Sequence, residues 1–373
     1  MRALGAIALA TAIWLPSLHF FHRGAPPHEL ARGIAAAELR LWTDPALRAR
    51  EIRRMRASNA EWDFMARSFL AWALANRALA EPATRRRALA AIDAIVDETL
   101  RLERERGQTH FLLPYGRARP FVDGARSQFV DGEIALMIAL RRLVEERRDW
   151  APLLTERVDA MAARMLRGPV LSAESYPDEC WTFCNTVALA AIRAADVLDG
   201  SDHAELLASW VRTAKRRLVH RPSGLLVSSY SRAGRALDGP EGSSIWLAAH
   251  MLDVVDPAFA RDQYRRAKRE IAHHALGFAW AGEWPRSWHG HDDVDSGPTW
   301  PLLDLSASSS GFALLGATAF RDAAYRDGLL SSLDLGGFPM RDGEAVRFAA
   351  SNAVGDAVAL YALSAGPAWR RLR

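Results

Sequence analysis

Short polar clusters run into apolar, alanine-rich segments at six places along the chain. Arginine-rich amphipathic stretches separate most of these segments, as outer helices would separate buried inner helices. This alternation predicts an all-α (α/α)6 toroid of six inner and six outer helices. The polar clusters would meet at one mouth of the ring, and short β-hairpins would lie in the loops. The clusters begin at Asn59, Phe129, Asp178, Glu241, Ser306 and Ser351.

Hydrophobic periodicity supports the helical class along most of the chain. Apolar residues recur at three- and four-residue spacing. The inner segments start about 45 to 70 residues apart, a spacing too irregular for a solenoid and better suited to a closed ring. Extended segments are expected at 111–114, 225–229 and 345–348. Helices are expected at 31–41, 66–80, 84–105, 133–146, 155–166, 186–198, 204–218, 245–255, 259–275, 311–320 and 353–363.

The N-terminal segment differs from the rest of the chain. An apolar run follows Arg2 and is about as long as a bilayer-spanning helix. An uncleaved signal anchor is favoured because no clear cleavage site follows the run; a cleaved signal peptide and a buried helix stay open. We therefore expect a membrane anchor at 1–23, a linker and leading helix at 24–54, and the toroid at 55–373. A periplasmic or otherwise extracytoplasmic domain is favoured over a cytoplasmic one.

Composition narrows the classes of function. Half of the 373 residues are hydrophobic and 25% are charged, so we expect a packed globular protein. The positive charge is almost entirely arginine, with lysine only at positions 215 and 268. No basic cluster alternates with aromatic residues, so we expect no binding of nucleic acid. The sequence also has no phosphate-binding loop, dinucleotide fingerprint or nucleophile-elbow motif.

The densest polar segment, 176–186, holds both cysteines of the chain. Cys180 and Cys184 are four residues apart, so their sulfurs would share one helix face if the helix has begun by Cys180. A helix N-terminus lowers the pKa of a thiol, so a cysteine here would act as a nucleophile or exchange a proton. The alternatives are a thiol that packs as a small apolar group, or half of a zinc site. A disulfide between the two stays open.

Asp131 lies in a second cluster, at the expected start of the helix that contains Glu133. It would either cap this helix or point into the ring mouth. In the mouth, an apolar wall of Phe129, Trp181 and Phe183 would raise the pKa of the carboxyl and suit it to general acid catalysis.

A rigid loop rich in tryptophan, glycine, proline and acids is expected at 283–298. Asp293 and Asp295 lie two residues apart, so an extended backbone would point both carboxylates toward the site. Trp288 and His289 would contact substrate in the same loop. Metal binding by the histidines and acids of the loop is the alternative, and we expect no metal site. Further substrate contacts are expected from Tyr115, Glu241 and Trp246.

Three motifs resemble the linalool dehydratase/isomerase-like family. They are Asp-Glu-Cys-Trp-Thr-Phe-Cys-Asn-Thr-Val-Ala-Leu at 178–189, Asp-Val-Asp-Ser-Gly-Pro at 293–298 and Ser-Ala-Ser-Ser-Ser-Gly-Phe at 306–312. The resemblance covers roughly residues 55 to 365 and implies an (α/α)6 toroid. It also implies an enzyme without a cofactor that removes water from a tertiary monoterpene alcohol and interconverts allylic isomers.

In that family, paired cysteines and nearby acids carry out the acid/base steps. Cys184 is similar to one of these cysteines, and Cys180 is a looser match to the other. Asp131 lies where the family places a site residue on the preceding inner helix. The apolar N-terminus indicates a membrane-anchored branch of the family.

Three functions are compatible with these features. The first is a lyase or isomerase for a small apolar alkenol, in which Cys184 moves a proton or attacks carbon while Asp131 or Asp295 protonates the leaving hydroxyl. Aromatic side chains would exclude water and stabilise positive charge on carbon. The second is a carbohydrate-active hydrolase or lyase with paired carboxylates, which the 13 tryptophans favour and the cysteines disfavour. The third is a membrane-anchored scaffold without activity. The oligomeric state stays open, and a homo-oligomer is compatible with the sequence.

Overall fold

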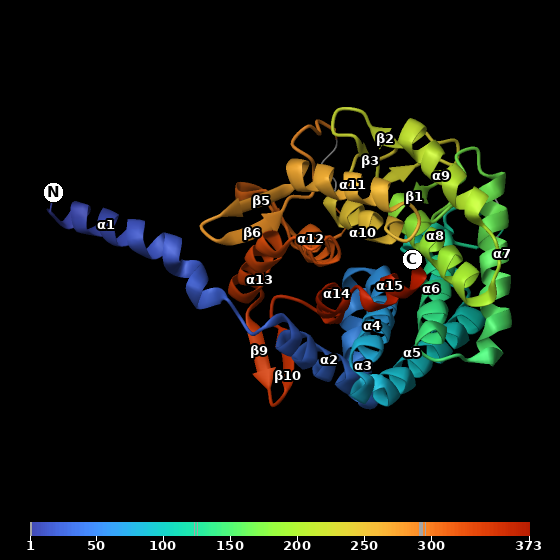
Figure 1. Cartoon of the computed structure of the whole chain (residues 1–373), viewed down its shortest axis with the longest axis horizontal. Coiled ribbons are helices and arrows are strands. Elements are labelled where there is room, and N and C mark those ends of the chain that lie inside the picture. Colours follow the sequence, from blue (N-terminus) through green and yellow to red (C-terminus); the bar gives the residue numbers. More distant parts are fainter. Residues whose placement is uncertain (1, 123, 125, 291–293, 295) are drawn as a thin grey trace.

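The computed structural model describes residues 2–122, 124, 126–290, 294 and 296–373. Among these residues, six inner helices form a closed ring in which each helix packs against the next (Figure 1). All six predicted polar clusters lie at the starts of these helices, so the (α/α)6 toroid is confirmed. The inner helices are α4 (Ala60–Ala80), α6 (Gln128–Val144), α8 (Thr182–Asp199), α10 (Gly242–Leu252), α12 (Ala307–Ala319) and α14 (Ala353–Ser364).

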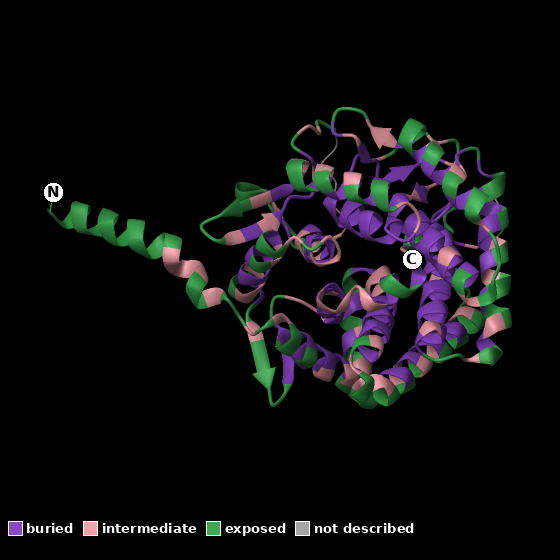
Figure 2. Cartoon of the chain, in the orientation of Figure 1, coloured by how far each residue is buried: buried purple, intermediate pink, exposed green. Residues whose placement is uncertain are grey.

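A second layer of helices covers the outside of the ring. Figure 2 shows these helices buried toward the ring and exposed on the other side, as their amphipathic sequences require. The sequence did not predict α3, which is rich in arginine, or α13, which contains several glycines. The outer helices are α2 (Pro27–Thr43), α3 (Pro45–Ser58), α5 (Arg85–Arg106), α7 (Ala151–Arg167), α9 (Ala204–Arg217), α11 (Pro257–Glu270) and α13 (Ala323–Gly337).

The ring closes where the two ends of the chain meet. α14 packs against both α4 and α2. Arg40 on α2 donates to Asp342 at 2.5 Å, and the backbone N–H at the start of α14 donates to Glu51 at 3.2 Å. The short α15 (Pro367–Leu372) then covers the end of the ring opposite the helix starts, where Trp369 stacks on His250 with 4.4 Å between ring centroids.

Short antiparallel strand pairs project from the loops. The segment 345–348 forms β10, and two short strands lie within and next to 225–229, so both predicted extended segments are confirmed. The prediction for 111–114 is wrong, because Pro114 begins a 3-10 turn there. The helix predicted to reach residue 275 ends at Glu270, because the chain turns back at Leu276 and Gly277, both at positive φ. The pairs are β5 (Ala272–Ala275) with β6 (Phe278–Ala281), β9 (Pro339–Asp342) with β10 (Ala345–Phe348), β1 (Cys180–Trp181) with β4 (Ser229–Tyr230), β2 (Val219–His220) with β3 (Leu225–Leu226), and β7 (Thr299–Trp300) with β8 (Leu305–Ser306).

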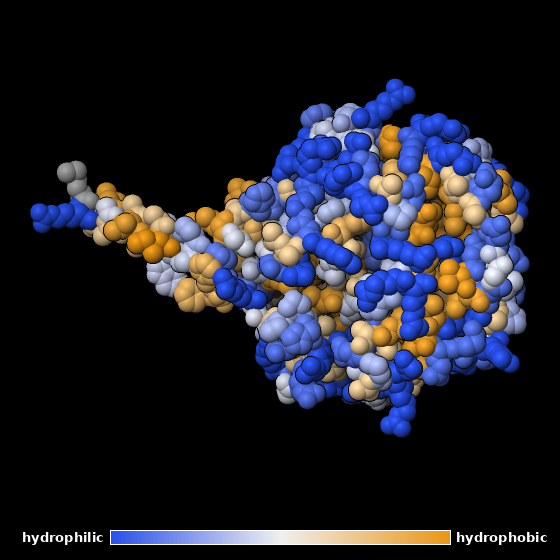
Figure 3. All heavy atoms as spheres, in the orientation of Figure 1, coloured by the Kyte–Doolittle hydropathy of each residue, from blue (hydrophilic) through white to orange (hydrophobic). Residues whose placement is uncertain are grey.

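The N-terminal helix α1 (Arg2–Ser17) extends away from the toroid and has no buried residue, which rules out the buried helix considered above (Figures 1 and 3). The next turn, η1 (Leu18–His22), contacts the ring and joins α1 to it. His22 contacts Asp334 of α13 at 3.0 Å, and the His19 ring lies 6.3 Å from that of Phe278 in β6. Residues 2–22 are long and apolar enough to span a membrane, a property that a signal sequence shares.

Candidate active site

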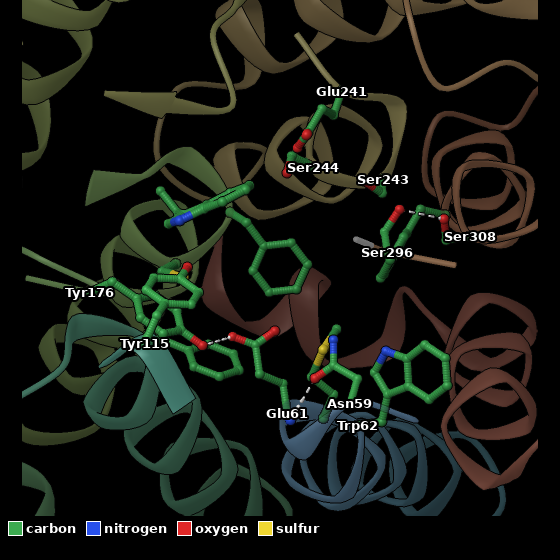
Figure 4. Close-up of a pocket in the computed structure, with 16 residues that line it drawn as sticks. Asn59, Glu61, Trp62, Tyr115, Tyr176, Glu241, Ser243, Ser244, Ser296 and Ser308 are labelled. Carbon is green, nitrogen blue, oxygen red and sulfur yellow. Dashed lines mark hydrogen bonds between the residues drawn. The ribbon is translucent and has the colours of Figure 1, made fainter. Parts of the chain in front are cut away.

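A pocket that is partly open to solvent lies at the mouth where the inner helices begin (Figure 4). Its wall is largely aromatic and carries two glutamates, a cysteine and several serines. Most of these groups lie at or near the starts of inner helices, and the inner helices all begin at the same end of the ring. The described lining residues are Asn59, Glu61, Trp62, Met65, Tyr115, Phe129, Tyr176, Trp181, Phe183, Cys184, Glu241, Ser243, Ser244, Ser296, Ser308 and Phe312.

Glu61 is fixed in the pocket by the start of α4. Asn59 caps this helix by accepting the backbone N–H of Glu61 at 2.8 Å. The Tyr176 hydroxyl donates to the Glu61 carboxylate and accepts the N–H of Leu113 at 2.9 Å. Tyr115 stacks on Tyr176 with 4.4 Å between ring centroids. Burial and the charge of Glu61 raise the pKa of Tyr176, so the phenol keeps its proton and serves as a fixed donor to Glu61.

Cys184 lies in the first turn of α8 and faces the same pocket. Burial raises the pKa of its thiol well above the usual range, and the charges of Glu61 and Glu133 add to this, although a hydrogen bond with Ser175 acts the other way. The expectation of a lowered thiol pKa is therefore wrong. Desolvation and two neighbouring carboxyls raise the thiol pKa by more than the helix N-terminus lowers it. Cys184 is a neutral, free thiol.

Glu133 lies beside this wall, fully buried in the second turn of α6. Ser68 donates to one of its oxygens at 2.5 Å, and the other oxygen has no hydrogen-bond partner among the described residues. Burial raises the pKa of Glu133 to about 8, and the charge of Glu61 contributes in the same direction. The carboxyl is therefore largely protonated at neutral pH.

The facing wall of the pocket carries hydroxyl groups. Figure 4 shows Ser243, Ser296 and Ser308 on one side of the cavity and Glu61 with Tyr176 on the other. Glu241, at the N-cap position of α10, also lines the pocket. The cavity thus has polar groups at two ends and aromatic rings between them.

The structure brings several predicted site residues together in this pocket. They come from the loop after α5 and from the starts of α6, α8 and α10, which are far apart in sequence. The predicted residues that line the pocket are Cys184, Phe129, Trp181, Phe183, Tyr115 and Glu241.

Cys180 does not line the pocket. It lies in β1, opposite Tyr230 of β4, because α8 begins only at Thr182. The two sulfurs therefore do not share a helix face. Burial raises the pKa of Cys180, and the charge of Glu174 adds to it; the thiol is free and fully buried.

Asp131 points away from the mouth, into a cluster of arginines beneath the outer helices. Its carboxylate accepts from Arg126, Arg157 and Arg164 at 2.5 to 2.9 Å and from Gln108 at 2.8 Å. Burial alone would raise the pKa of Asp131, but the hydrogen bond from Arg126 and the other two charges lower it. The expected raised pKa of Asp131 is thus wrong. Its carboxylate stabilises the fold by binding the three arginines.

Three other predicted residues, Trp246, Trp288 and His289, are not part of the cavity wall. Trp246 is fully buried and donates to Ser309 at 3.2 Å. Trp288 stacks on Trp284 with 5.6 Å between ring centroids, and His289 is exposed. The predicted residues Asp293 and Asp295 lie outside the described residues. Within the described part of the chain, no group of three or more His, Cys, Asp or Glu is arranged to hold a metal ion.

Glu61 and Tyr176 were not predicted as site residues. A signal for Glu61 was present, because it lies in the first of the six polar clusters and every cluster starts an inner helix. Glu133 had the same signal, but its hydrogen-bond partner Ser68 lies on another helix, and no local pattern shows that contact.

Comparison with known proteins gives a family and a fold. The family model described as linalool dehydratase/isomerase matches residues 155–347. Unsaturated glucuronyl hydrolase from Bacillus sp. GL1 superposes with a TM-score of 0.53 at 13% identity, covering 82% of this chain and 86% of that chain. D-mannose isomerase gives 0.50 at 9% identity, covering 80% and 86%. The GH76 alpha-mannanase from Bacteroides thetaiotaomicron gives 0.50 at 11% identity, covering 82% and 86%. At these identities the likeness is one of fold alone, and a search of curated proteins finds no match.

Proposed function

The chain belongs to the linalool dehydratase/isomerase family, and we propose that it is a lyase or isomerase that removes, adds or shifts a hydroxyl group on a small neutral alkenol. The observation that supports this most directly is the position of Glu61 and Cys184 in one aromatic pocket. A carboxylate and a neutral thiol supply a proton acceptor and a proton donor without a cofactor.

The proton transfers of a dehydration can be assigned to these two groups. Glu61 takes a proton from the carbon next to the carbinol, and the Cys184 thiol gives its proton to the departing hydroxyl. The C–H and C–O bonds break, a C=C bond forms and water leaves. One proton transfer from Glu61 back to Cys184 then restores the starting state. Because Glu133 is largely protonated at neutral pH, the transient thiolate faces one fewer carboxylate charge.

The pocket suits a neutral substrate. None of its described lining residues is arginine, lysine or histidine, while Glu61 and Glu241 are acidic. A carboxylate or phosphate would find no counter-charge there. The rings of Trp181, Phe183 and Phe312 suit an apolar carbon skeleton and positive charge that develops on carbon. We further propose that α1 anchors the protein to a membrane, which would present a substrate that partitions into lipid.

The test uses the full chain in mild detergent with a panel of acyclic alkenols in D2O, read by gas chromatography and mass spectrometry. We expect water loss together with deuterium incorporation at carbon. Glu61→Gln and Cys184→Ala should each lower the rate by about 100-fold or more. Glu145→Gln, an exposed glutamate at the end of α6, is the control. Full activity of Cys184→Ala would contradict the assigned role of the thiol.

A carbohydrate-active hydrolase is the second candidate, and one observation favours it. Glu61 and Glu241 line the same pocket, as the paired carboxylates of such an enzyme do. Glycoside hydrolysis that is lost in Glu61→Gln and Glu241→Gln but unchanged in Cys184→Ala would support this function and exclude the first.

A further inference from the structure

We propose that the serine-lined wall facing Glu61 is a second binding subsite that takes a hydrogen-bond donor of the substrate, so the preferred substrate is an alkenediol or a similar molecule with hydroxyl groups at both ends. This inference rests on the proposed function. It adds to that function the class of substrate that the pocket prefers.

A buried carboxylate organises this wall. Glu283 accepts the N–H and the hydroxyl of Ser243 at 2.9 and 2.6 Å. Its other oxygen accepts the hydroxyl of Ser306 at 2.5 Å. Ser308 lies 3.1 Å from Ser306 and donates to Ser296 at 2.9 Å. Three of these serines face the cavity, so the network ends at the pocket surface.

The network determines whether Ser243 can donate or accept a hydrogen bond toward the pocket. A serine hydroxyl has one hydrogen, and that of Ser243 is committed to Glu283. Toward the pocket, the Ser243 oxygen can therefore only accept. Glu241 also lines the pocket. A ligand group that binds at Ser243 must donate, as a hydroxyl does.

The backbone holds this wall rigidly. A Cβ at Gly242 would lie 2.0 Å from Ser309 Oγ and 2.7 Å from the carbonyl of Gly282, so α10 begins in close contact with α12 and the end of β6. Ser306 caps α12 by accepting the N–H of Ser309 at 3.1 Å. Ser243 and Ser306 thus have little freedom to turn, and binding would require little ordering of the wall.

The two polar ends define the ligand. Glu61, with the fixed donor Tyr176, lies at one end, the serine wall lies at the other, and aromatic rings line the space between (Figure 4). A simple alkenol satisfies only one end and leaves the Ser243 oxygen at the other end facing its hydrocarbon tail. A second terminal hydroxyl would donate to this oxygen.

The experiment compares two probes: an acyclic ten-carbon alkenol and the same molecule with a second hydroxyl at its far end. Binding to the full chain in detergent is followed by isothermal calorimetry. We expect the diol to bind about three- to tenfold more tightly, the effect of one neutral hydrogen bond. Ser243→Ala should remove this preference, so that the two probes bind about equally, and Ser243→Thr, which keeps the hydroxyl, should retain it.

Ser310→Ala is the matched control. Its hydroxyl belongs to the same region and bonds backbone groups of Ser306 and Ala281, but it is not among the lining residues. Thermal unfolding of each variant checks that the fold is intact. Equal binding of both probes to the wild type would overturn this inference and leave the proposed function standing, as would a diol preference that persists in Ser243→Ala. Binding of neither probe would overturn the proposed function and this inference with it.

Discussion

Glu133→Gln should make the protein more stable at alkaline pH. Glu133 is fully buried, and its folded-state pKa is about 8, against 4.5 for an ordinary glutamate. A raised folded-state pKa contributes stability that is fully present below the unfolded-state pKa and is lost as pH rises through the folded-state value. The wild type should therefore lose stability between about pH 4.5 and pH 8, whereas a glutamine at this position does not titrate.

The size of the effect follows from the pKa difference. A gap of roughly 3.5 units corresponds to about 5 kcal/mol as an upper value, because each unit is worth about 1.4 kcal/mol. An unfolding entropy near 2 cal/mol/K per residue gives about 0.8 kcal/mol/K for a chain of this length. The Tm of Glu133→Gln should then exceed that of the wild type by up to roughly 6 °C at pH 9 and differ little at pH 4.5.

The assay is thermal unfolding followed by circular dichroism, in one detergent at several pH values. Glu145→Gln, which removes an exposed carboxylate from the end of the same helix, is the control. The reasoning would be refuted by a Tm difference between Glu133→Gln and the wild type that stays constant from pH 4.5 to 9. Glu133 would then not be the buried, protonated group that its surroundings in α4 and α6 imply.

Three further outcomes are expected. Tyr176→Phe removes the hydroxyl donated to Glu61 and should lower kcat by about tenfold or more while shifting the pH–rate profile; an unchanged profile would show that Tyr176 does not act through Glu61. Cys184 should resist iodoacetamide at pH 7.5 in the folded protein and react only after unfolding, as followed by mass spectrometry; rapid labelling would contradict a raised thiol pKa. Asp131→Ala should destabilise the fold by about 3 to 5 kcal/mol because the buried Arg164 loses its carboxylate partner, and ligand affinity measured well below Tm should not change. Arg126 and Arg157 keep Glu103 as a partner.

The sequence was sufficient for the architecture because the signals for inner helices are local. A polar cluster lies at the start of each apolar segment, and all six clusters were visible in the sequence. At the starts of α4, α12 and α14 a side chain of the cluster accepts a backbone N–H of the first turn. The same clusters located the pocket. The direction of individual side chains could not be read from the local sequence. Asp131 turns outward because three arginines surround it, and two of them, Arg157 and Arg164, lie on another helix.

The backbone conformation at the two cysteines could not be predicted from the local sequence either. Cys180 and Cys184 have helical spacing, but the pairing of β1 with β4, about 50 residues later in the chain, keeps Cys180 out of the helix. The thiol pKa likewise depended on burial and on Glu61 and Glu133, which come from two other helices. Local sequence reasoning sees the favourable helix start and not the carboxyls packed against it.

The seam between α14 and α4 has a consequence for how the protein is made. Beside this seam, Arg40 of α2 meets Asp342 of β9, which is 302 positions later in the chain. Translation at about 5 to 20 residues per second leaves roughly 15 to 60 s between the emergence of the two. During that interval the ring is an open arc, and the side of α4 that carries Phe69 and Trp72, which later packs against Tyr361 of α14, has no partner. The nascent chain is therefore most exposed to aggregation just before its last inner helix leaves the ribosome, and a truncation that removes α14 would leave it in that state.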